Sequence, residues 1–310
     1  MNRTDRVAVT SRSFSRNQQL RCELLARYEH VTFNEQGRQL EKDALVDFLR
    51  GHHKAITALE RIDEPLLAQL PELRVIAKYG VGLDMVDLAA MRRLGKRLGW
   101  RPGVNRRSVA ELTLAFAIVL LRHVPAAHRE VLSGTWRQHV GGLLSGRTVG
   151  IVGCGCVGKD LVGLLGPFDC TILVRDIVDY PEFYARHGIE AVSLAELLRR
   201  ADVVSLHVPL DDSTRGLIST AELELMKPSA VLINTARGGI LDEDALKKAL
   251  ASKRIAAAAC DVFLEEPPAD PGLLELPNFL ATPHIGGSAH EAILLMGRAA
   301  IDGLDENQLP

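Results

Sequence analysis

The sequence predicts an α/β protein with two doubly wound, parallel-sheet domains, and three observations lead to this fold class. Short apolar segments alternate with amphipathic helical segments along most of the chain, which is typical of parallel sheets covered by helices. A glycine-rich turn, Gly153-Cys-Gly-Cys-Val-Gly158, follows one apolar segment and precedes a helical one. The chain has 310 residues, which at roughly 150 residues per domain suggests two domains.

The elements of the smaller domain come first. Predicted strands cover residues 7–10, 31–33, 55–57 and 73–77, and predicted helices cover residues 17–28, 41–50, 63–69 and 84–94. The turn-rich segment Arg101-Pro-Gly-Val-Asn105 interrupts the alternation and marks a boundary. An apolar helix over residues 109–121 follows, with Ser108 or Asn105 as its N-cap. It is too short to cross a bilayer, so we expect it in a buried core or a subunit interface.

The alternation is stronger in the second half of the chain. Strands are predicted over residues 149–152, 171–175, 203–208, 230–235, 255–260 and 279–282, and helices over residues 157–165, 194–200, 220–226 and 242–251. Together they predict a doubly wound sheet of six or more strands. Such sheets bind ligands beyond the carboxyl ends of their strands, so the polar residues that follow the strands are the candidates for function.

The glycine turn has the context of a dinucleotide site, because it joins a strand to a helix. Gly153 permits the tight turn, Gly155 lets the backbone approach a pyrophosphate, and Gly158 lets the helix pack closely. The next strand ends at Asp176, which lies 176 − 158 = 18 residues beyond the last glycine and can accept hydrogen bonds from a ribose. Asp176 would repel the 2′-phosphate of NADP, and strand alternation directs Arg175 to the opposite face. NAD is therefore the predicted cofactor.

Composition excludes several other classes of function. The chain is 47% hydrophobic and 25% charged with a net charge of −2, so no overall field favours nucleic acid or an anionic membrane. We expect the basic run Arg92-Arg93 to Lys96-Arg97 at a solvated helix end. Five cysteines and no apolar leader segment indicate a reducing, cytoplasmic setting. Cys154 and Cys156 lack further ligands at metal spacing, so no metal site is predicted.

Three charged or titratable residues follow successive strands of the second half. Arg237 comes after residues 230–235, Glu266 after residues 255–260, and His284 after residues 279–282. Alone, Arg237 would be read as half of a surface ion pair and His284 as a hydrogen-bonded loop residue. Together they match the needs of 2-keto acid reduction: a guanidinium holds the carboxylate, an imidazole protonates the alkoxide, and a carboxylate raises the pKa of that imidazole.

These residues resemble those of a known family, the D-isomer-specific 2-hydroxyacid dehydrogenases, especially the D-3-phosphoglycerate dehydrogenase and hydroxypyruvate reductase branch. The resemblance extends over nearly the whole chain. Its motifs are Lys78-Tyr-Gly-Val-Gly-Leu-Asp84, the glycine turn, Leu206-His-Val-Pro-Leu210, Asn234-Thr-Ala-Arg-Gly-Gly-Ile240, Cys260-Asp-Val-Phe-Leu-Glu-Glu-Pro267 and Thr282-Pro-His-Ile-Gly-Gly-Ser288.

The resemblance implies a role for each motif. The catalytic set would be Arg237, Glu266 and His284, with Asp261 directed toward the nicotinamide carboxamide. The residues implied in cofactor binding are Gly153, Gly155, Cys156, Val157, Gly158, Asp176, His207, Val208, Pro209, Thr214, Thr235, Ala236, Asp261, Gly286 and Gly287. The residues implied in substrate binding are Lys78, Gly80, Val81, Gly82, Arg101 and Arg237.

The resemblance also implies the organisation of the chain. Residues 1–104 and 286–310 would form a flavodoxin-like substrate-binding domain, and residues 105–285 a Rossmann NAD-binding domain. Partners would be a small 2-hydroxy or 2-keto acid and a second copy, in a homodimer built partly on the 109–121 helix. No nucleic acid and no membrane are expected as partners.

Several alternatives stay open at this stage. Gly80-Val81-Gly82 is either an anion-binding nest for a carboxylate or a plain turn, and Lys78 either faces a substrate phosphate or is solvated. The segment Lys96–Gly103 departs from the family, which usually has an apolar strand and a Thr-Pro-Gly turn there. Other candidate functions are a corepressor-like NAD sensor without turnover, and a related dehydrogenase acting on a one-carbon or phosphorus-containing acid.

Overall fold

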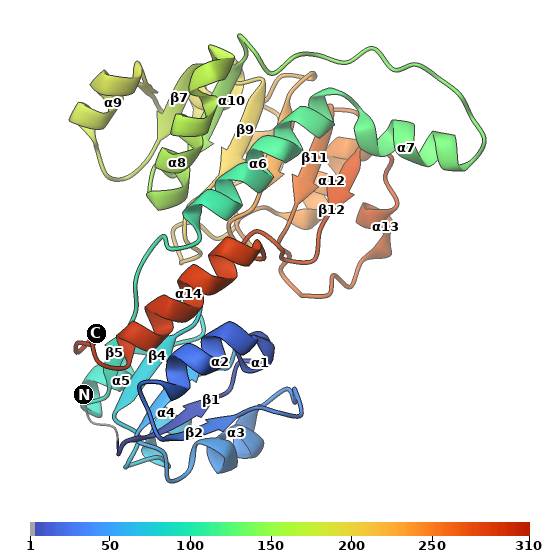
Figure 1. Cartoon of the computed structure of the whole chain (residues 1–310). Coiled ribbons are helices and arrows are strands. Elements are labelled where there is room, and N and C mark those ends of the chain that lie inside the picture. Colours follow the sequence, from blue (N-terminus) through green and yellow to red (C-terminus); the bar gives the residue numbers. More distant parts are fainter. Residues whose placement is uncertain (1–3) are drawn as a thin grey trace. The chain divides into compact units, whose positions relative to one another are not determined.

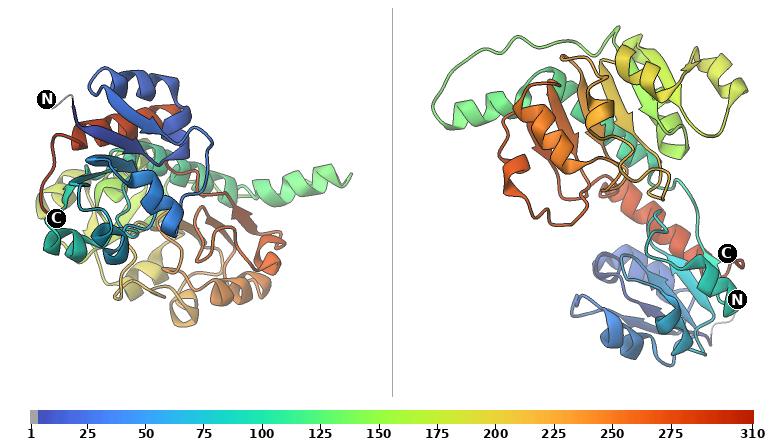
Figure 2. Two further views of the ribbon diagram at one scale, coloured as in Figure 1. Left: turned by 90° about the horizontal axis from the view of Figure 1, so that it is seen from below. Right: turned by 180° about the vertical axis from the view of Figure 1, so that it is seen from behind.

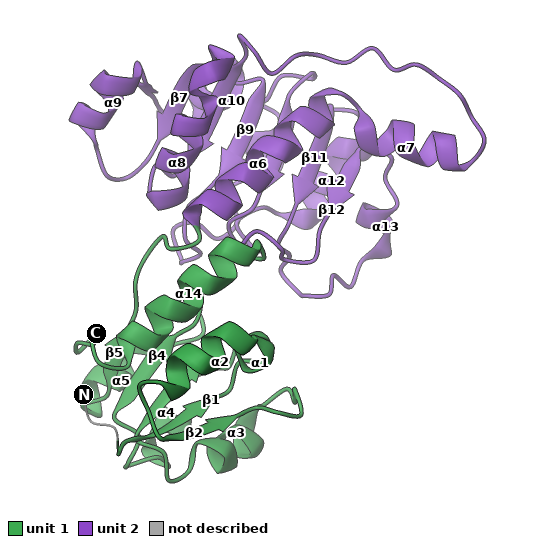
Figure 3. Ribbon diagram, viewed as in Figure 1, with its two compact units in different colours: residues 1–105, 288–310 green, residues 106–287 purple. Residues whose placement is uncertain are grey.

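The computed structural model describes residues 4–310. The first three residues of the N-terminal stretch from which the absence of a leader was expected lie outside the described residues. The chain forms two compact units, coloured separately in Figure 3. Unit 1 comprises Met1–Asn105 and Ser288–Pro310, and unit 2 comprises Arg106–Gly287. Each unit has its own sheet and its own core.

Unit 1 is built on a five-stranded parallel sheet in the order β2-β1-β3-β4-β5. The strands are β1 (Arg6–Val9), β2 (His30–Phe33), β3 (Lys54–Thr57), β4 (Val75–Lys78) and β5 (Arg97–Gly99). The helices are α1 (Arg12–Arg16), α2 (Gln18–Leu25), α3 (Lys42–Leu49), α4 (Glu64–Ala68), α5 (Leu88–Arg93) and α14 (His290–Gly303). One apolar cluster joins the sheet to α3, α4 and α5, and another joins it to α1, α2 and α14 (Figure 1).

Local caps explain where unit 1 departs from the predicted helices. The helix predicted over residues 17–28 is the shorter α2, which starts after Asn17 because the Asn17 side chain accepts a hydrogen bond from the Leu20 N–H at 3.0 Å. The short helix α1, which precedes it, was not predicted. The helix predicted over residues 84–94 starts only at Leu88, where Asp87 caps it. The placement of the basic run at a solvated helix end is wrong for Lys96, which is buried and donates to the Leu70 carbonyl at 2.8 Å.

The segment that departs from the family pattern nevertheless forms a strand. β5 pairs in parallel with β4, with Ala77 opposite Gly99. A side chain at Gly99 would overlap the backbone of Gly303 in α14, so glycine permits the helix and the edge strand to meet closely.

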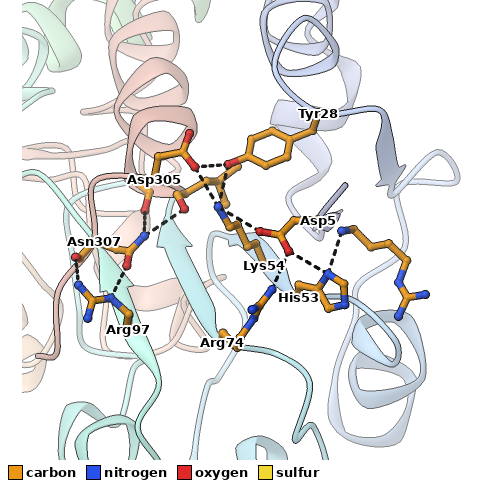
Figure 4. A network of polar contacts seen from close by, with 11 residues as sticks. Asp5, Tyr28, His53, Lys54, Arg74, Arg97, Asp305 and Asn307 are labelled. Atoms are coloured by element: carbon orange, nitrogen blue, oxygen red, sulfur yellow. Dashed lines mark hydrogen bonds and ion pairs between the residues drawn. The ribbon is translucent and has the colours of Figure 1, made fainter. Parts of the chain in front are cut away.

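A partly buried polar network connects the C-terminal segment to the starts of the unit 1 strands (Figure 4). The Lys54 ammonium donates to the Tyr28 hydroxyl at 3.0 Å and to Asp305 Oδ1 at 2.9 Å. The Tyr28 hydroxyl itself donates to Asp305 Oδ1 at 2.6 Å. Asp5 accepts from Arg74 at 2.6 Å and lies 3.5 Å from the Lys54 ammonium. Strand carboxyl ends lie at the other edge of a parallel sheet, so this network serves stability rather than ligand binding.

Unit 2 is built on a seven-stranded parallel sheet in the order β12-β11-β10-β9-β6-β7-β8. The strands are β6 (Thr148–Val152), β7 (Thr171–Arg175), β8 (Glu190–Ala191), β9 (Val203–Leu206), β10 (Val231–Asn234), β11 (Ala257–Cys260) and β12 (Phe279–Ala281). The edge strand β8 was not predicted, because two exposed residues carry no apolar pattern. Its position beside β7 makes the sheet one strand larger than the six strands recognised from sequence.

Helices cover both faces of this sheet. The helices of unit 2 are α6 (Arg106–Leu121), α7 (Val124–Leu132), α8 (Cys156–Leu165), α9 (Pro181–His187), α10 (Leu194–Arg200), α11 (Thr220–Leu223), α12 (Glu243–Ala251) and α13 (Pro271–Leu274). One apolar cluster includes α10, α11 and α12, and the other includes α6 and α8. Helix α6 begins at Arg106. Of the two predicted N-cap residues, Asn105 therefore directly precedes the helix, whereas Ser108 lies within its first turn and is wrong.

Helix α7 and the segment after it differ from the rest of unit 2. No residue of α7 is buried, and both views in Figure 2 show α7 extending away from the body of unit 2. Leu132 is 74% exposed, Trp136 85% and Val140 94%. Among the described residues, no single helix has the length and apolarity to cross a membrane, whereas α6 and α7, bent by 65°, meet that test only as a pair.

Candidate active site

The three glycines of the 153–158 turn meet three different steric demands. Gly153 has φ +98°, and a Cβ there would lie 2.8 Å from the Val208 nitrogen. A Cβ at Gly158 would overlap the Gly153 carbonyl oxygen, so α8 packs closely against the turn. A Cβ at Gly155 would have no atom within 4 Å, and Gly155 is the N-cap of α8 without any side-chain cap. The open space at Gly155 and the uncapped helix N-terminus fit a pyrophosphate.

Asp176 lies beside this turn, at the end of β7. Its carboxylate accepts from the Cys154 N–H at 2.5 Å and from the Val178 N–H at 2.9 Å. The Arg175 guanidinium donates to the Asp176 carbonyl. Because a carboxylate offers about four acceptor positions, Asp176 keeps capacity for the hydroxyls of a ribose.

Adjacent strands bring Arg237, Glu266 and His284 to one edge of the unit 2 sheet. β10, β11 and β12 are neighbours and parallel, and these residues follow them in that order. Asn234 shapes the first loop, because its side chain accepts from the Ala236 N–H at 3.1 Å and donates to the Arg237 carbonyl at 2.9 Å. A side chain at Gly238 would overlap the backbone of Phe263, so the Arg237 loop lies directly against the Glu266 loop.

His284 and Glu266 form a hydrogen-bonded pair. The imidazole Nδ1 lies 2.9 Å from Glu266 Oε2 and 3.1 Å from Oε1. The two side chains are 43% and 41% exposed, so the pair is reachable from solvent. His284 also has φ +54°, a backbone conformation that costs a non-glycine residue on the order of 1–3 kcal/mol and is concentrated at functional sites.

Asp261 holds the loop that carries His284. Asp261 is only 1% exposed. Its carboxylate accepts hydrogen bonds from the Thr282 hydroxyl at 2.5 Å, the Ile285 N–H at 2.8 Å and the Gly286 N–H at 2.7 Å. The Asp261 carbonyl accepts from the His284 N–H at 2.9 Å. In this structure Asp261 therefore organises the His284 loop, and the expected orientation of its carboxylate toward a nicotinamide is not what the contacts favour.

The other residues expected to line the cofactor differ in burial and in their hydrogen-bond partners. The Thr235 hydroxyl is buried and lies 2.9 Å from the Thr113 hydroxyl of α6, and the Gly286 carbonyl accepts from Ser108 at 2.6 Å. His207 Nε2 lies 2.8 Å from the Ser205 hydroxyl, and burial lowers the pKa of His207 to about 4, so the ring is neutral near pH 7. The Thr214 hydroxyl donates to the Pro209 carbonyl at 2.7 Å. The residues of this group with partly or fully exposed surface are Cys156, Val157, His207, Val208, Pro209, Thr214, Ala236 and Gly287.

The substrate-binding candidates other than Arg237 lie in unit 1. Gly80 has φ +123°, and a Cβ there would have no atom within 4 Å. The Trp100 indole donates to the Val81 carbonyl at 2.9 Å. Lys78 is only 5% exposed and donates to the Ala58 carbonyl, so the alternative that it is solvated is wrong. Arg101 pairs with Glu306 at 3.3 Å, and a substrate contact would have to compete with this pair.

The sequence did not identify the residues that support the site from behind. Asn234, Thr113, Ser205 and Ser108 all form hydrogen bonds to candidate residues or their loops. Ser205 and Asn234 are polar residues inside otherwise apolar strands, and this was the available signal. Thr113 gave none, because a hydroxyl inside an apolar helix commonly bonds its own backbone.

The described residues 4–310 contain neither a metal-binding cluster nor a disulfide. Within residues 4–310 no group of three or more His, Cys, Asp or Glu side chains is arranged to hold a metal. All five cysteines are free. Burial raises the pKa of Cys154 to about 11, so its thiol stays protonated and unreactive at neutral pH.

The fold and this site define a class of protein, a dinucleotide-dependent dehydrogenase, and comparison with known proteins identifies its family. Residues 114–286 match the model of the D-isomer specific 2-hydroxyacid dehydrogenase NAD binding domain. The chain is 37% identical over 265 residues to a glyoxylate reductase of Thermococcus litoralis, covering 83% of this chain and 78% of that one. It is 38% identical over 233 residues to the D-3-phosphoglycerate dehydrogenase of Mycobacterium bovis, covering 74% of this chain but only 44% of that protein.

A solved structure agrees with the sequence relatives. A protein of Polaromonas sp. JS6 66, assigned to the NAD-binding D-isomer specific 2-hydroxyacid dehydrogenases, superposes with a TM-score of 0.88 at 28% identity, covering 97% of this chain and 96% of that one. The chain belongs to the D-isomer-specific 2-hydroxyacid dehydrogenase family. It is an NAD-dependent oxidoreductase acting on CH–OH groups, and the predicted family, fold class and cofactor are confirmed.

Proposed function

We propose that this enzyme interconverts a small 2-keto acid and its D-2-hydroxy acid, with Arg237 binding the substrate carboxylate and carbonyl and with His284, paired to Glu266, as general acid and base. The observation that carries the proposal is the contact between His284 Nδ1 and Glu266 Oε2 at 2.9 Å. Glu266 follows β11, the strand next to β10, which Arg237 follows.

The proposed chemistry depends on which imidazole nitrogen of His284 is hydrogen-bonded to Glu266. Glu266 accepts from His284 Nδ1, so Nε2 is the nitrogen directed at substrate in either charge state. Bound NADH supplies the hydride. As the carbonyl carbon is reduced, protonated His284 donates its Nε2 proton to the forming alkoxide, and Glu266 stabilises the imidazolium before that transfer. General acid catalysis of this kind contributes about 10²- to 10⁴-fold in rate.

The proposed substrates are small acids of the glyoxylate, hydroxypyruvate or phosphoglycerate type. Relatives named glyoxylate reductase and D-3-phosphoglycerate dehydrogenase support this range. Because the match covers 44% of the latter protein, the phosphorylated substrate is the weaker candidate. Gly80, Val81 and Gly82 would bind the carboxylate through backbone N–H groups. A preference for NADH over NADPH, based on Asp176, belongs to the same proposal.

The test is NADH oxidation across 2-keto acids of increasing size, with and without phosphate, on the wild type and on Arg237→Ala and His284→Ala. We expect turnover by the wild type and a loss of at least 10²-fold in kcat/KM for each variant at unchanged folding. Near wild-type rates in both variants would refute the proposed roles. Tight NADH binding without turnover of any acid would instead favour the alternative, an NAD-sensing corepressor-like protein.

We also propose that the enzyme is a cytoplasmic homodimer whose second copy covers α7 and the segment that follows it. The exposed apolar side chains of Leu132, Trp136 and Val140 support this, since patches of this kind mark protein interfaces. The five free cysteines support the reducing compartment. Light scattering on the wild type and on a Leu132→Ser, Val140→Ser double variant tests the dimer, and a monomeric wild type would exclude it.

A further inference from the structure

Trp100 contacts the Gly80–Gly82 turn through a single directional bond. We propose that Trp100 is a positioning residue that orients this turn to receive the substrate carboxylate. The inference rests on the proposed function, because it assigns the carboxylate to the turn. Within residues 4–310, the one side-chain hydrogen bond between Trp100 and the turn runs from the indole N–H to the Val81 carbonyl, at 2.9 Å.

Because the peptide unit is planar, the hydrogen bond to the Val81 carbonyl also fixes the direction of the Gly82 N–H group. The Val81 carbonyl and the Gly82 N–H belong to one trans peptide, so they point in opposite directions. When Trp100 holds the carbonyl, the Gly82 N–H is directed away from the indole. Within residues 4–310, the N–H groups of Gly80, Val81 and Gly82 donate to no protein group. Three undonated N–H groups in one turn suit an anionic oxygen.

Glycine flexibility explains why the turn requires such a constraint. Gly80 has φ +123°, and a Cβ at this position would have no atom within 4 Å. Without packing on that side, the turn has many accessible conformations. A single hydrogen bond to its central carbonyl removes the alternatives in which this peptide plane is rotated.

The residues on both sides of Trp100 contact the C-terminal segment of unit 1. Gly99 precedes it at the end of β5 and packs against the backbone of Gly303 in α14. Arg101 follows it and pairs with Glu306 at 3.3 Å and with Asp302 at 4.0 Å. The segment that carries the indole is therefore joined to the C-terminal segment of unit 1 on both sides of Trp100, and 38% of Trp100 is exposed. Arg101 accordingly contributes to the site by anchoring Trp100.

The chain offers a matched control for a tryptophan substitution, because it has only two tryptophans. Trp100→Phe keeps an aromatic ring and removes the N–H donor. Trp136→Phe makes the same change in unit 2, in the segment assigned above to the subunit interface and not to substrate or cofactor binding. Phenylalanine keeps an apolar ring at that position, so the dimer should be unaffected. With glyoxylate and NADH, we expect Trp100→Phe to raise the KM for glyoxylate about three- to tenfold, the effect of one hydrogen bond. The kcat and the KM for NADH should stay within about twofold, and Trp136→Phe should match the wild type in all three.

A fluorescence titration tests the inference without turnover. In Trp136→Phe, Trp100 is the sole tryptophan, and oxalate, an unreactive dicarboxylate, should change its emission in a saturable manner. In Trp100→Phe, where only Trp136 emits, oxalate should leave the emission unchanged. An unaltered KM for glyoxylate in a folded Trp100→Phe, or no response of Trp100 to oxalate, overturns the inference.

The two proposals fail in different ways. If the wild type reduces 2-keto acids and Trp100→Phe does so with an unchanged KM, only the role of Trp100 is wrong. If the wild type reduces none, the proposed reaction is wrong, and the response of Trp100 to oxalate then decides whether the turn binds a carboxylate.

Discussion

His284 Nδ1 lies 2.9 Å and 3.1 Å from the two carboxylate oxygens of Glu266. The contact joins two loops that follow adjacent strands, β11 and β12. Because Glu266 occupies Nδ1, it sets which imidazole nitrogen carries the transferable proton. Glu266 also accepts from the Phe263 N–H at 3.1 Å, which holds the carboxylate in place.

Removing the charge of Glu266 should slow the chemical step. In Glu266→Gln the amide oxygen still accepts from Nδ1, but it no longer stabilises the imidazolium. We expect kcat for keto-acid reduction to fall about 10- to 100-fold, within the range of general acid catalysis, with little change in the KM for NADH. Glu265→Gln is the matched control, since Glu265 is an exposed neighbour. Equal kcat values in the two variants would show that Glu266 is not the partner of the catalytic histidine.

Asp261 provides a second test, one that separates support of the loop from cofactor binding. Asp261→Asn loses the charge that three donors share, so we expect a loss of about 1–3 kcal/mol in the free energy of unfolding. We also expect a fall in kcat, because the His284 loop is released. The dissociation constant for NADH, measured by fluorescence, should change less than threefold. A large weakening of NADH binding with kcat intact would instead support contact with the nicotinamide.

The glycine turn predicts opposite outcomes for two similar substitutions. Gly155→Ala adds a methyl group in open space, whereas Gly158→Ala would overlap the Gly153 carbonyl. We expect Gly155→Ala to keep the wild-type Tm but to weaken NADH binding at least tenfold, since the methyl group occupies pyrophosphate space. Gly158→Ala should lower the Tm markedly. If Gly155→Ala bound NADH with the affinity of the wild type, the pyrophosphate would not bind at this turn.

The network in Figure 4 predicts a loss of stability at alkaline pH. Burial, together with hydrogen bonding to Asp305, raises the pKa of Tyr28 to about 12. An unfolded tyrosine titrates near pH 10, so the stabilisation is complete below about pH 10 and is lost as pH rises toward about 12. The shift corresponds to roughly 2–3 kcal/mol.

Chemical denaturation between pH 8 and pH 12 measures that loss. Tyr28→Phe cannot ionise, so its free energy of unfolding should fall less steeply over about pH 10–12 than that of the wild type. Tyr180→Phe is the comparison outside this network, because Tyr180 belongs to unit 2. Burial raises the pKa of Tyr180 as well, but less than that of Tyr28, so the curve of Tyr28→Phe should be the flatter of the two. Parallel curves for the wild type and Tyr28→Phe would show that Tyr28 does not govern the alkaline transition.

Local patterns were sufficient for most of the fold. The strand over residues 171–175 and the helix over residues 194–200 have the predicted bounds, because apolar runs and caps such as Ser193 are local signals. Strand β5 was not predicted, because it depends on contact with Gly303, about two hundred residues away in the chain. Lys96 was misjudged for a similar reason, since its burial depends on the carbonyls of Leu70 and Pro71.

The sequence by itself determined the two-unit α/β architecture, the glycine turn and the order of Arg237, Glu266 and His284 after their strands. Hydrophobic periodicity and glycine spacing are patterns of contiguous residues, so they can be read from the sequence. Because neighbouring parallel strands end at the same edge of a sheet, residues that follow such strands lie close together. Only the tertiary structure decided what the side chains touch. It directs Asp261 to the His284 loop, Arg101 to Glu306 and Trp100 to Val81. Hydrogen bonds of this kind depend on distances between distant segments, which are set when the sheets pack and are absent from any local pattern.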